Sequence, residues 1–371
     1  MCSGDESAPT ATILVPVLNE ARWLRQTAAA ICGQAVDGGI EVLFIDGGSC
    51  DGSRELLARL AADDERIRVL DNPERVVPAA LNRGLREARG RYVARMDAHT
   101  VYPRDYVARG IERLSRGDVE WASGPAVPHA STGFARCVAA ALGSPLGRGG
   151  SSKWSHAGGG PPETELDTGV FAGVWPRATL ERLGGWDPDF HVNEDAEMAA
   201  RVLGGGGRIV CLASMAARYA PRSTLRGLWR QYWRFGRYRA MTARRHPIAL
   251  RRAHLAPVAL TATVAASAVP ARLVRRPAHA AIAVYAVVVG AAAARVAPTR
   301  TARDIGGVAV ALATMHLSWG AGFIYGCARG GPPIDGLRRL LRRAPRDAAA
   351  PVGSRRASAA RADHAGERRV G

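Results

Sequence analysis

Short apolar runs alternate with segments of helical periodicity through the first hundred residues. The runs are rich in β-branched residues and predict buried strands, and the segments between them predict amphipathic helices. The predicted strands are 11–17, 42–45, 66–70 and 91–96, and the predicted helices are 19–30, 54–62 and 77–89. Regular alternation of strand and helix favours a parallel sheet covered by helices, so the expected fold class is α/β.

The pattern is less regular after residue 100. Residues 143–162 are rich in Gly, Ser and Pro and predict a long loop, which in a compact domain is usually functional or disordered. A strand, a proline and a helix are expected over 172–185, and another helix over 196–203. Local signals also predict that Ser53 caps the second helix and that Gly90 ends the third.

Three apolar runs without a charged residue lie near the C-terminus, at 255–271, 278–294 and 305–328. A membrane-spanning helix needs about 20 mostly apolar residues, which the third run has and the second nearly has. The first run is short and contains Pro257, so it is expected to be re-entrant or interfacial. The alternative is that these Ala-rich runs are buried core helices of a soluble domain.

Charge separates the two parts of the chain. The formal net charge is +18, yet residues 1–217 sum to −5 and residues 218–371 to +23. A basic block indicates binding to nucleic acid or attachment to an anionic membrane surface. Because the basic residues flank apolar runs and the folded half is acidic, the pattern favours the membrane and disfavours nucleic acid.

The arginines also predict an orientation. The first ten residues contain no apolar stretch of the kind found in a secretory signal, so we expect the N-terminal half to stay in the cytosol. Ten arginines lie within 222–252 and eleven from residue 329 onward. Both flanks are expected on the cytoplasmic side of the inner membrane, which requires an even number of spans and means that one of the three runs does not cross.

Polar residues follow the predicted strands. Asn19, Asp46 and Asp97 each come just past a strand end, and ligands of parallel α/β sheets bind at the carboxyl ends of the strands. These three side chains therefore form a candidate site. None of the six cysteines forms a CxxC pair, so a zinc site or redox motif is unsupported.

Several stretches, weak singly, together resemble family 2 glycosyltransferases with the GT-A fold. They are VPVLNE at 15–20, DGGSCDGS at 46–53, ALNRG at 80–84, GRYVARMDAH at 90–99, GGWD at 184–187 and NED at 193–195. The variant DAHT at 97–100 and MHLSWG at 315–320 look most like succinoglycan-biosynthesis-type transferases. The implied organisation is a flexible N-terminus (1–10), a GT-A domain (11–220), an interfacial helix region (221–253), two or three membrane helices (254–330) and a basic, disordered tail (331–371).

The resemblance implies a site for a nucleotide-sugar donor. Asp46 corresponds to the aspartate that hydrogen-bonds a pyrimidine base, which favours uridine, and the turn after it already contains Gly and Ser enough to form without it. The remaining donor-binding residues would be Pro16, Asn19, Glu20, Asn82 and Asp97. For the segment 51–53, ordinary turn and cap chemistry is the preferred interpretation.

A divalent cation, Mn²⁺ or Mg²⁺, is implied as cofactor because the departing diphosphate builds up negative charge. The family's Asp-x-Asp pair is here Asp97 and His99, so an imidazole replaces the second carboxylate. His99 is either a metal ligand, which would suit Mn²⁺, or a cap of the following turn that leaves Asp97 alone on the metal or the ribose.

Asp195 is the expected general base. An inverting transferase needs one carboxylate to take the proton of the acceptor hydroxyl, and the family uses the aspartate of a Glu-Asp pair, here Glu194 and Asp195. Glu194 would orient the acceptor or the loop. The structural alternative is an acidic cluster at a helix N-terminus.

The acceptor side is expected on a basic, aromatic segment. Gln231, Arg234 and Phe235 resemble the family's Q-x-x-R-W motif, with Phe in place of Trp, and Trp186 is a further candidate for the acceptor. Arginines and aromatics at helical spacing are equally typical of an interfacial helix.

The implied function is inverting transfer of a hexose from a nucleotide sugar, such as UDP-glucose, to a lipid-linked saccharide in exopolysaccharide or cell-surface glycan synthesis. Two alternatives stay open. The chain could load a sugar directly onto polyprenyl phosphate, or it could be a non-catalytic membrane protein that binds nucleotide sugars.

Overall fold

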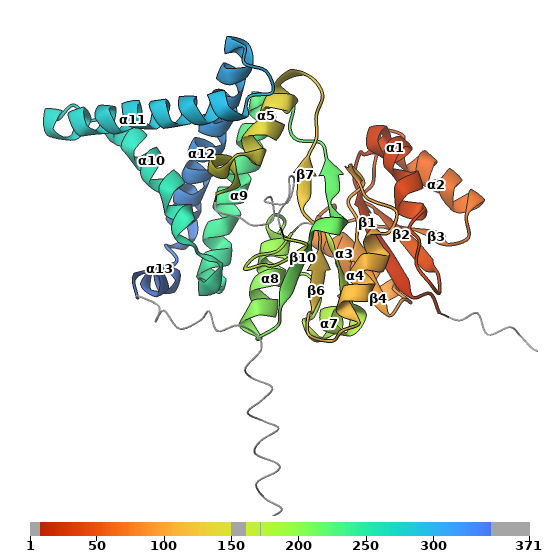
Figure 1. Ribbon diagram of the computed structural model, residues 1–371. Helices are drawn as coiled ribbons and strands as arrows, with labels where there is room; N and C mark the ends of the chain where they lie inside the picture. Colours follow the sequence, from red (N-terminus) through yellow and green to blue (C-terminus); the bar gives the residue numbers. More distant parts are fainter. Residues whose placement is uncertain (1–7, 150–160, 171, 343–371) are drawn as a thin grey trace, which may run out of the picture.

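One central sheet of eight strands has the order β3-β2-β1-β4-β9-β6-β10-β8. The computed structural model describes residues 8–149, 161–170 and 172–342 (Figure 1). The strands of this sheet are β1 (Ala11–Val17), β2 (Ile40–Asp46), β3 (Ile67–Asp71), β4 (Tyr92–Arg95), β6 (Trp121–Ser123), β8 (Glu163–Glu165), β9 (Gly173–Pro176) and β10 (Ile209–Leu212). A second sheet has the order β5-β11-β7, formed by β5 (Thr100–Val101), β11 (Ala217–Tyr219) and β7 (Ala126–Pro128).

The four strands predicted for the N-terminal part are confirmed, and they are parallel to one another. β9 then runs antiparallel to β4 and to β6. Because β1, β2 and β4 point the same way, the residues that follow them lie at one edge of the sheet.

Helices cover both faces of this sheet and continue into a C-terminal bundle. They are α1 (Ala21–Cys32), α2 (Ser53–Asp63), α3 (Val77–Glu87), α4 (Tyr106–Leu114), α5 (Gly133–Gly143), α6 (Pro145–Arg148), α7 (Arg177–Arg182), α8 (Glu194–Gly204), α9 (Leu225–Arg245), α10 (Leu255–Ala266), α11 (Arg272–Val296), α12 (Ala302–Gly330) and α13 (Ile334–Leu341).

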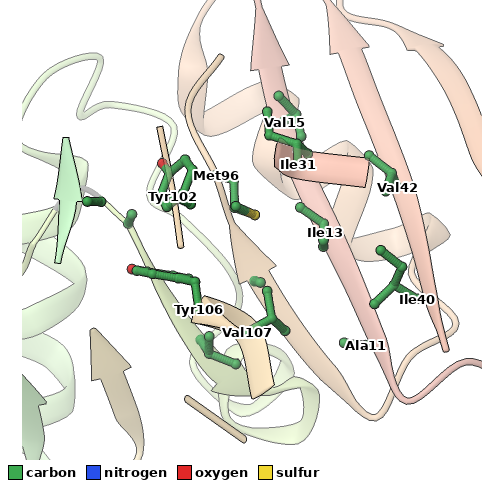
Figure 2. Packing of buried hydrophobic residues seen from close by; sticks show 14 of the residues in the cluster. Ala11, Ile13, Val15, Ile31, Ile40, Val42, Met96, Tyr102, Tyr106 and Val107 are labelled. Atoms are coloured by element: carbon green, nitrogen blue, oxygen red, sulfur yellow. The ribbon is translucent and has the colours of Figure 1, made fainter. Parts of the chain in front are cut away.

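The alternation of side chains along β1 divides the core into two layers. Ile13 and Val15 pack with residues of α1, α2 and α4 on one face (Figure 2). Leu14 points to the other face, where it joins residues of α3, α7 and α8. All three side chains are buried, as expected for a strand covered on both sides.

The C-terminal helices pack on α9 through glycines. A Cβ atom added to Gly236 of α9 would lie 1.9 Å from the carbonyl oxygen of Trp319, and one added to Gly322 of α12 would lie 2.0 Å from that of Trp233. The backbones of α9 and α12 therefore touch with no side chain between them. Because Asn193 before α8 also hydrogen-bonds the α9 backbone, this helix contacts both the domain built on the central sheet and the C-terminal helical bundle.

Two of the three apolar runs form helices long and apolar enough to cross a membrane, namely α11 and α12. The first run forms α10, which at 12 residues is too short to span, as its length and proline suggested. Half of the most apolar window of α12 is buried by other parts of the protein, against 17% for α11. Figure 1 shows α11 running across α12 rather than alongside it.

Three local expectations need correction. Ser53 is not the cap of α2, because Gly52 holds the N-cap position in the left-handed region (φ 93°) and Ser53 is the first helical residue. The third helix ends at Glu87, before Gly90. The tail expected to be disordered from residue 331 begins with α13, whose Leu337 packs against the α9–α12 contact.

Other expectations fall partly outside the described residues. The loop predicted at 143–162 begins with the short helix α6, and its segment 150–160 is not described. The same holds for residues 1–7 of the predicted flexible N-terminus and for 343–371 of the tail.

The glycine contact predicts a selective sensitivity to added methyl groups. Gly322→Ala should destabilise the protein by about 1–3 kcal/mol, because the new Cβ atom overlaps backbone that cannot rotate away. Gly306→Ala is the matched control on the same helix, since nothing lies within 4 Å of the position. It should be neutral or stabilising by up to about 1 kcal/mol. Thermal unfolding in detergent measures both, and equal melting temperatures for the two variants would contradict the packing described here.

Candidate active site

The segment that carries the expected base is held by an unusual backbone. Asn193, the residue before α8, lies in the left-handed region with φ 65°, a conformation that Asn tolerates better than most residues. Its side-chain amide donates to the carbonyl oxygen of Phe235 on α9, at 3.2 Å. The start of α8 is thereby tied to the helix that carries the predicted acceptor residues.

A buried arginine joins the two acidic parts of the site. The guanidinium of Arg95 donates from Nε to Asp97 and from Nη1 to Glu194, each at 2.9 Å. Only 5% of the Arg95 side chain is exposed. Burial raises the pKa of Glu194, and the charge of Arg95 offsets this effect only in part. The bridge thus fixes the end of β4 against the start of α8.

Asp195 lies next to this bridge and is half-buried. Its Oδ1 accepts from the backbone N–H of Ala196 at 2.8 Å. Within the described residues, Oδ2 has no hydrogen-bond partner. One carboxylate oxygen is therefore fixed by the helix N-terminus, and the other is available to a ligand.

His99 contacts Glu20 rather than capping the next turn. Its Nδ1 lies 3.2 Å from Glu20 Oε1, which joins the end of β4 to the start of α1. Burial lowers the pKa of His99, but the hydrogen bond to Glu20 and the nearby charge of Asp97 outweigh it and raise the pKa overall.

The residues present suit a cation whose coordination is supplied partly by the protein and partly by a bound ligand. Among the described residues, no group of three or more His, Cys, Asp or Glu side chains could hold a metal by itself. Asp97 and His99 nevertheless line one cavity together, and His99 Nε2 has no partner among the described side chains. Mg²⁺-type sites often use one or two protein ligands and complete their coordination with phosphates and water.

The turn after β2 is built around Asp46. The carboxylate of Asp46 is buried and accepts from the N–H of Gly48 and of Ser49 and from the Ser49 hydroxyl. Ser49 in turn accepts from the N–H of Asn19 at 2.9 Å, while the Asn19 side chain accepts from Cys50. In this structure Asp46 therefore shapes the turn, and its contact with a base stays a prediction, as do the roles of Pro16 and Asn19.

Asp51 and Ser53 do what turn chemistry predicts. Asp51 accepts from the N–H of Ala21 at the start of α1 and from the Ser53 hydroxyl. Ser53 accepts from the N–H of Glu20 at 2.9 Å. The turn thus positions Glu20 and the first residue of α1, Ala21.

Asn82 and Trp186 need correction as ligand-binding residues. The Asn82 amide donates to the Trp186 carbonyl at 2.6 Å and accepts from the Trp186 N–H at 2.7 Å. The indole of Trp186 is 1% exposed and packs edge-on against Trp175. Both residues stabilise the Gly-Gly-Trp turn, because the Asn82 amide bonds the backbone of Trp186 and the Trp186 indole packs on Trp175.

One cavity of about 750 Å³ brings the predicted cation, base and acceptor residues together, whereas its lining does not include Pro16, Asn19, Glu20 or Asp46. Asp97, His99, Glu194 and Asp195 line it from the edge of the sheet. Gln231, Arg234 and Phe235 line it from α9, and residues of α10 and α12 close its far end. Asp97 and Trp319, which are 222 residues apart in the chain, thus line the same cavity.

Known proteins resemble this chain in sequence. A family model described as Glycosyl transferase family 2 matches residues 12–137. The "Succinoglycan biosynthesis protein ExoA" of Rhizobium meliloti (strain 1021) is 35% identical over 252 residues, which are 66% of this chain and 74% of that protein. The chain belongs to glycosyltransferase family 2. A shorter match, 29% identical over 26% of this chain and 28% of the relative, is to the "Putative glycosyltransferase EpsH" of Bacillus subtilis (strain 168).

The fold is also similar to that of a solved structure. The mannosyltransferase PcManGT from Pyrobaculum calidifontis, solved in complex with GDP-Man and Mn²⁺, aligns with a TM-score of 0.57 at 23% identity. The alignment covers 88% of this chain and 90% of that one. The predicted GT-A-like α/β fold is therefore confirmed, and the protein is a glycosyltransferase.

Sequence reasoning gave no role to Arg95, although a signal was present. An arginine inside a buried apolar strand needs a carboxylate partner, since an unpaired buried charge is strongly unfavourable. Its position two residues before Asp97 pointed to such a partner. Glu194, 99 residues further along the chain, could not be found from local pattern.

The Arg95 bridge predicts a pH-dependent loss of stability in this family 2 enzyme. Arg95→Gln should cost about 3–5 kcal/mol at pH 7, because Glu194 is left buried without its cation. The pKa of Glu194 is already raised in the folded protein, and it should rise further in the variant. A group with a raised carboxyl pKa destabilises the fold as pH increases, so the loss should shrink as pH is lowered toward 5.

Urea unfolding at pH 7 and pH 5 measures this effect. Arg182→Gln is the control, because Arg182 pairs with Glu120 at the surface and its loss should cost no more than about 1 kcal/mol at either pH. A loss in Arg95→Gln that does not change with pH would show that Glu194 is not the group left uncompensated.

Proposed function

We propose that this enzyme transfers a hexose, with inversion, from a uridine diphosphate sugar to a lipid-linked saccharide at the cytoplasmic face of the inner membrane. The observation that carries the proposal is the cavity that joins Asp195 to the end of β4 on one side and to α9 on the other. A donor at the sheet edge and an acceptor along α9 would meet at this carboxylate.

Asp195 is proposed as the general base. Asp195 lines the cavity beside the Arg95 bridge, and the N–H of Ala196 holds one of its carboxylate oxygens in place. The acceptor hydroxyl would give its proton to Oδ2 as it attacks the anomeric carbon. The leaving diphosphate needs no protonation, so one carboxylate is sufficient.

Asp97 and His99 would hold a divalent cation together with the donor diphosphate. Such an ion supplies charge neutralisation for the leaving group. Arg95 keeps the Asp97 carboxylate in a fixed orientation, and Glu20 keeps the His99 ring in place. Mn²⁺ in the solved complex of the mannosyltransferase supports this assignment.

A membrane acceptor is supported by the composition of the far wall of the cavity. Residues of α10 and α12 contribute to it, and α12 is apolar enough to cross a membrane. The 35% identity to a protein named for succinoglycan biosynthesis supports a role in polysaccharide biosynthesis. Phe235 offers an aromatic face for a sugar of the acceptor, and Gln231 offers an amide.

Replacement of the base should abolish transfer without removing the donor site. Asp195→Asn should lower the transfer rate by about 10²–10⁴-fold, because the amide cannot accept the proton, while the donor dissociation constant changes less than about twofold. Asp189→Asn, an exposed position six residues earlier, is the matched control and should retain activity. Release of nucleoside diphosphate in the presence of lipid extract measures the rate. Near-normal turnover in Asp195→Asn would refute the assignment.

Donor and metal can be tested in the same assay. Purified protein should release UDP from one uridine diphosphate sugar in Mn²⁺ or Mg²⁺, and EDTA should suppress the release. GDP-mannose should be a poor donor. Faster release from GDP-mannose than from every uridine diphosphate sugar would overturn the proposed donor class while leaving the enzyme class intact.

A further inference from the structure

The cavity continues past the proposed base toward the bundle, where three cationic or polar side chains meet. Arg239 comes from α9, and Arg251 and His254 come from the turns that precede α10. We refer to these three residues as the cationic cluster. None of them was among the residues predicted for the acceptor.

Arg239 has no partner within the part of the chain that the structure describes. It makes neither a hydrogen bond nor an ion pair there, and burial lowers the pKa of Arg239 to about 10. Asp195 is the carboxylate that most offsets this effect. A guanidinium that lines a cavity and has no partner in the protein can bind an anion there, because its five N–H donors need acceptors.

His254 presents a donor to the same space. Its Nδ1 accepts from the backbone N–H of Arg251 at 3.2 Å, so the proton of the neutral ring is on Nε2. Burial, together with Arg239 and Arg251, holds the pKa of His254 well below its usual range, so the ring stays neutral at pH 7. Nε2–H has no acceptor among the described residues.

Arg251 is only partly compensated. One of its N–H groups donates to Asp167 at 2.5 Å, but 72% of the Asp167 side chain is exposed to solvent. The charge of Arg251 disfavours that of Arg239, and the charges of Asp195 and Asp167 favour it. An added anion would satisfy both guanidinium groups and the His254 donor.

The surroundings indicate which anion fits. The ring of His254 lies on Trp319 of α12, and Trp319 stacks on Phe323, with ring centroids 5.3 Å apart in both pairs. The cationic cluster thus lies where a polar cavity meets an apolar helix. A phosphate that carries a hydrocarbon chain matches both sides, whereas a soluble nucleotide would leave the apolar side unused.

We propose that the cationic cluster binds the phosphate or diphosphate group of a lipid-linked acceptor and so sets the distance of its sugar from Asp195. This proposal rests on the proposed transfer to a lipid-linked acceptor. It concerns residues of the same cavity other than the proposed cation-binding pair, Asp97 and His99.

The test is the binding of geranyl diphosphate, a short prenyl diphosphate, to full-length protein in a non-ionic detergent. Arg239→Gln should weaken binding at least about 10-fold, because charge-assisted hydrogen bonds are lost. His254→Phe keeps the ring on Trp319 but removes the Nε2 donor, and it should also weaken binding. Arg226→Gln, an exposed position on the same helix outside the cavity, removes the same charge and should bind as the wild type does.

The donor site serves as the internal control. The dissociation constant of UDP should be unchanged in all three variants, which would also show that they are folded. Arg239→Lys, which restores a charge without the planar fork, should recover part of the lost affinity.

Three outcomes would overturn the proposal. Arg239→Gln and His254→Phe could both bind geranyl diphosphate as tightly as the wild type. UDP could displace the probe, and Arg239→Gln could weaken the binding of UDP by the same factor, which would assign the cationic cluster to the donor. Phosphatidylglycerol in mixed micelles could displace the probe with equal affinity, which would make the ligand an ordinary membrane headgroup.

Failure of the proposed function would be seen separately. If no nucleotide sugar is turned over although UDP and geranyl diphosphate bind as described, the proposed subsite is supported and the proposed transfer reaction is wrong. If turnover depends on Asp195 but geranyl diphosphate binds equally well to the Arg239 and His254 variants, the proposed reaction is supported and the proposed subsite is wrong.

Discussion

The geometry of the site depends on one buried cation. Arg95 is held in the sheet by its place on β4, and it fixes Asp97 and Glu194 at the same time. Its two partners, Asp97 and Glu194, are 97 residues apart in the sequence. The bridge therefore fixes the start of α8, and with it Asp195, against the end of β4. A salt bridge of this kind adds little net stability over an apolar pair, but it leaves few alternative arrangements once its charges are buried.

The helix α9 connects the central sheet domain with the C-terminal bundle through contacts on two of its sides. Asn193 hydrogen-bonds its backbone on the side of the active site, and the glycines of α9 and α12 bring two backbones together on the other side. The same helix also supplies Phe235 and Arg239 to the cavity. Phe235 and Arg239 are therefore attached to one helix that also holds Asn193, whereas Arg251 and His254 lie in the turns that precede α10.

Much of the sheet could be predicted from the sequence because strand and helix leave strong local periodicities. The four parallel strands and the edge carrying Asn19, Asp46 and Asp97 followed from these periodicities alone. Two failures concern local helix ends, at Ser53 and Gly90, and the others depend on partners distant in the chain. Trp186 looked like an acceptor residue until its indole was seen packed on Trp175.

The same limit applies to the site. Arg239 and His254 belong to none of the quoted motifs, and although Arg95 lies within GRYVARMDAH, its partner Glu194 becomes apparent only in three dimensions. The start of the C-terminal tail is similar, because its arginines suggested disorder while the leucines of α13 found an apolar surface on α9. Composition described the charge of that segment correctly, but not its packing.

The crossing of α11 and α12 affects the number of times that the chain can cross a membrane. A flat bilayer has a single normal, so two helices that lie across each other cannot both follow it (Figure 1). An arrangement in which α10, α11 and α12 share one leaflet would bring no helix to the opposite surface. The arginines before α10 and those after α12 would then stay on the same side, because zero crossings is also an even number.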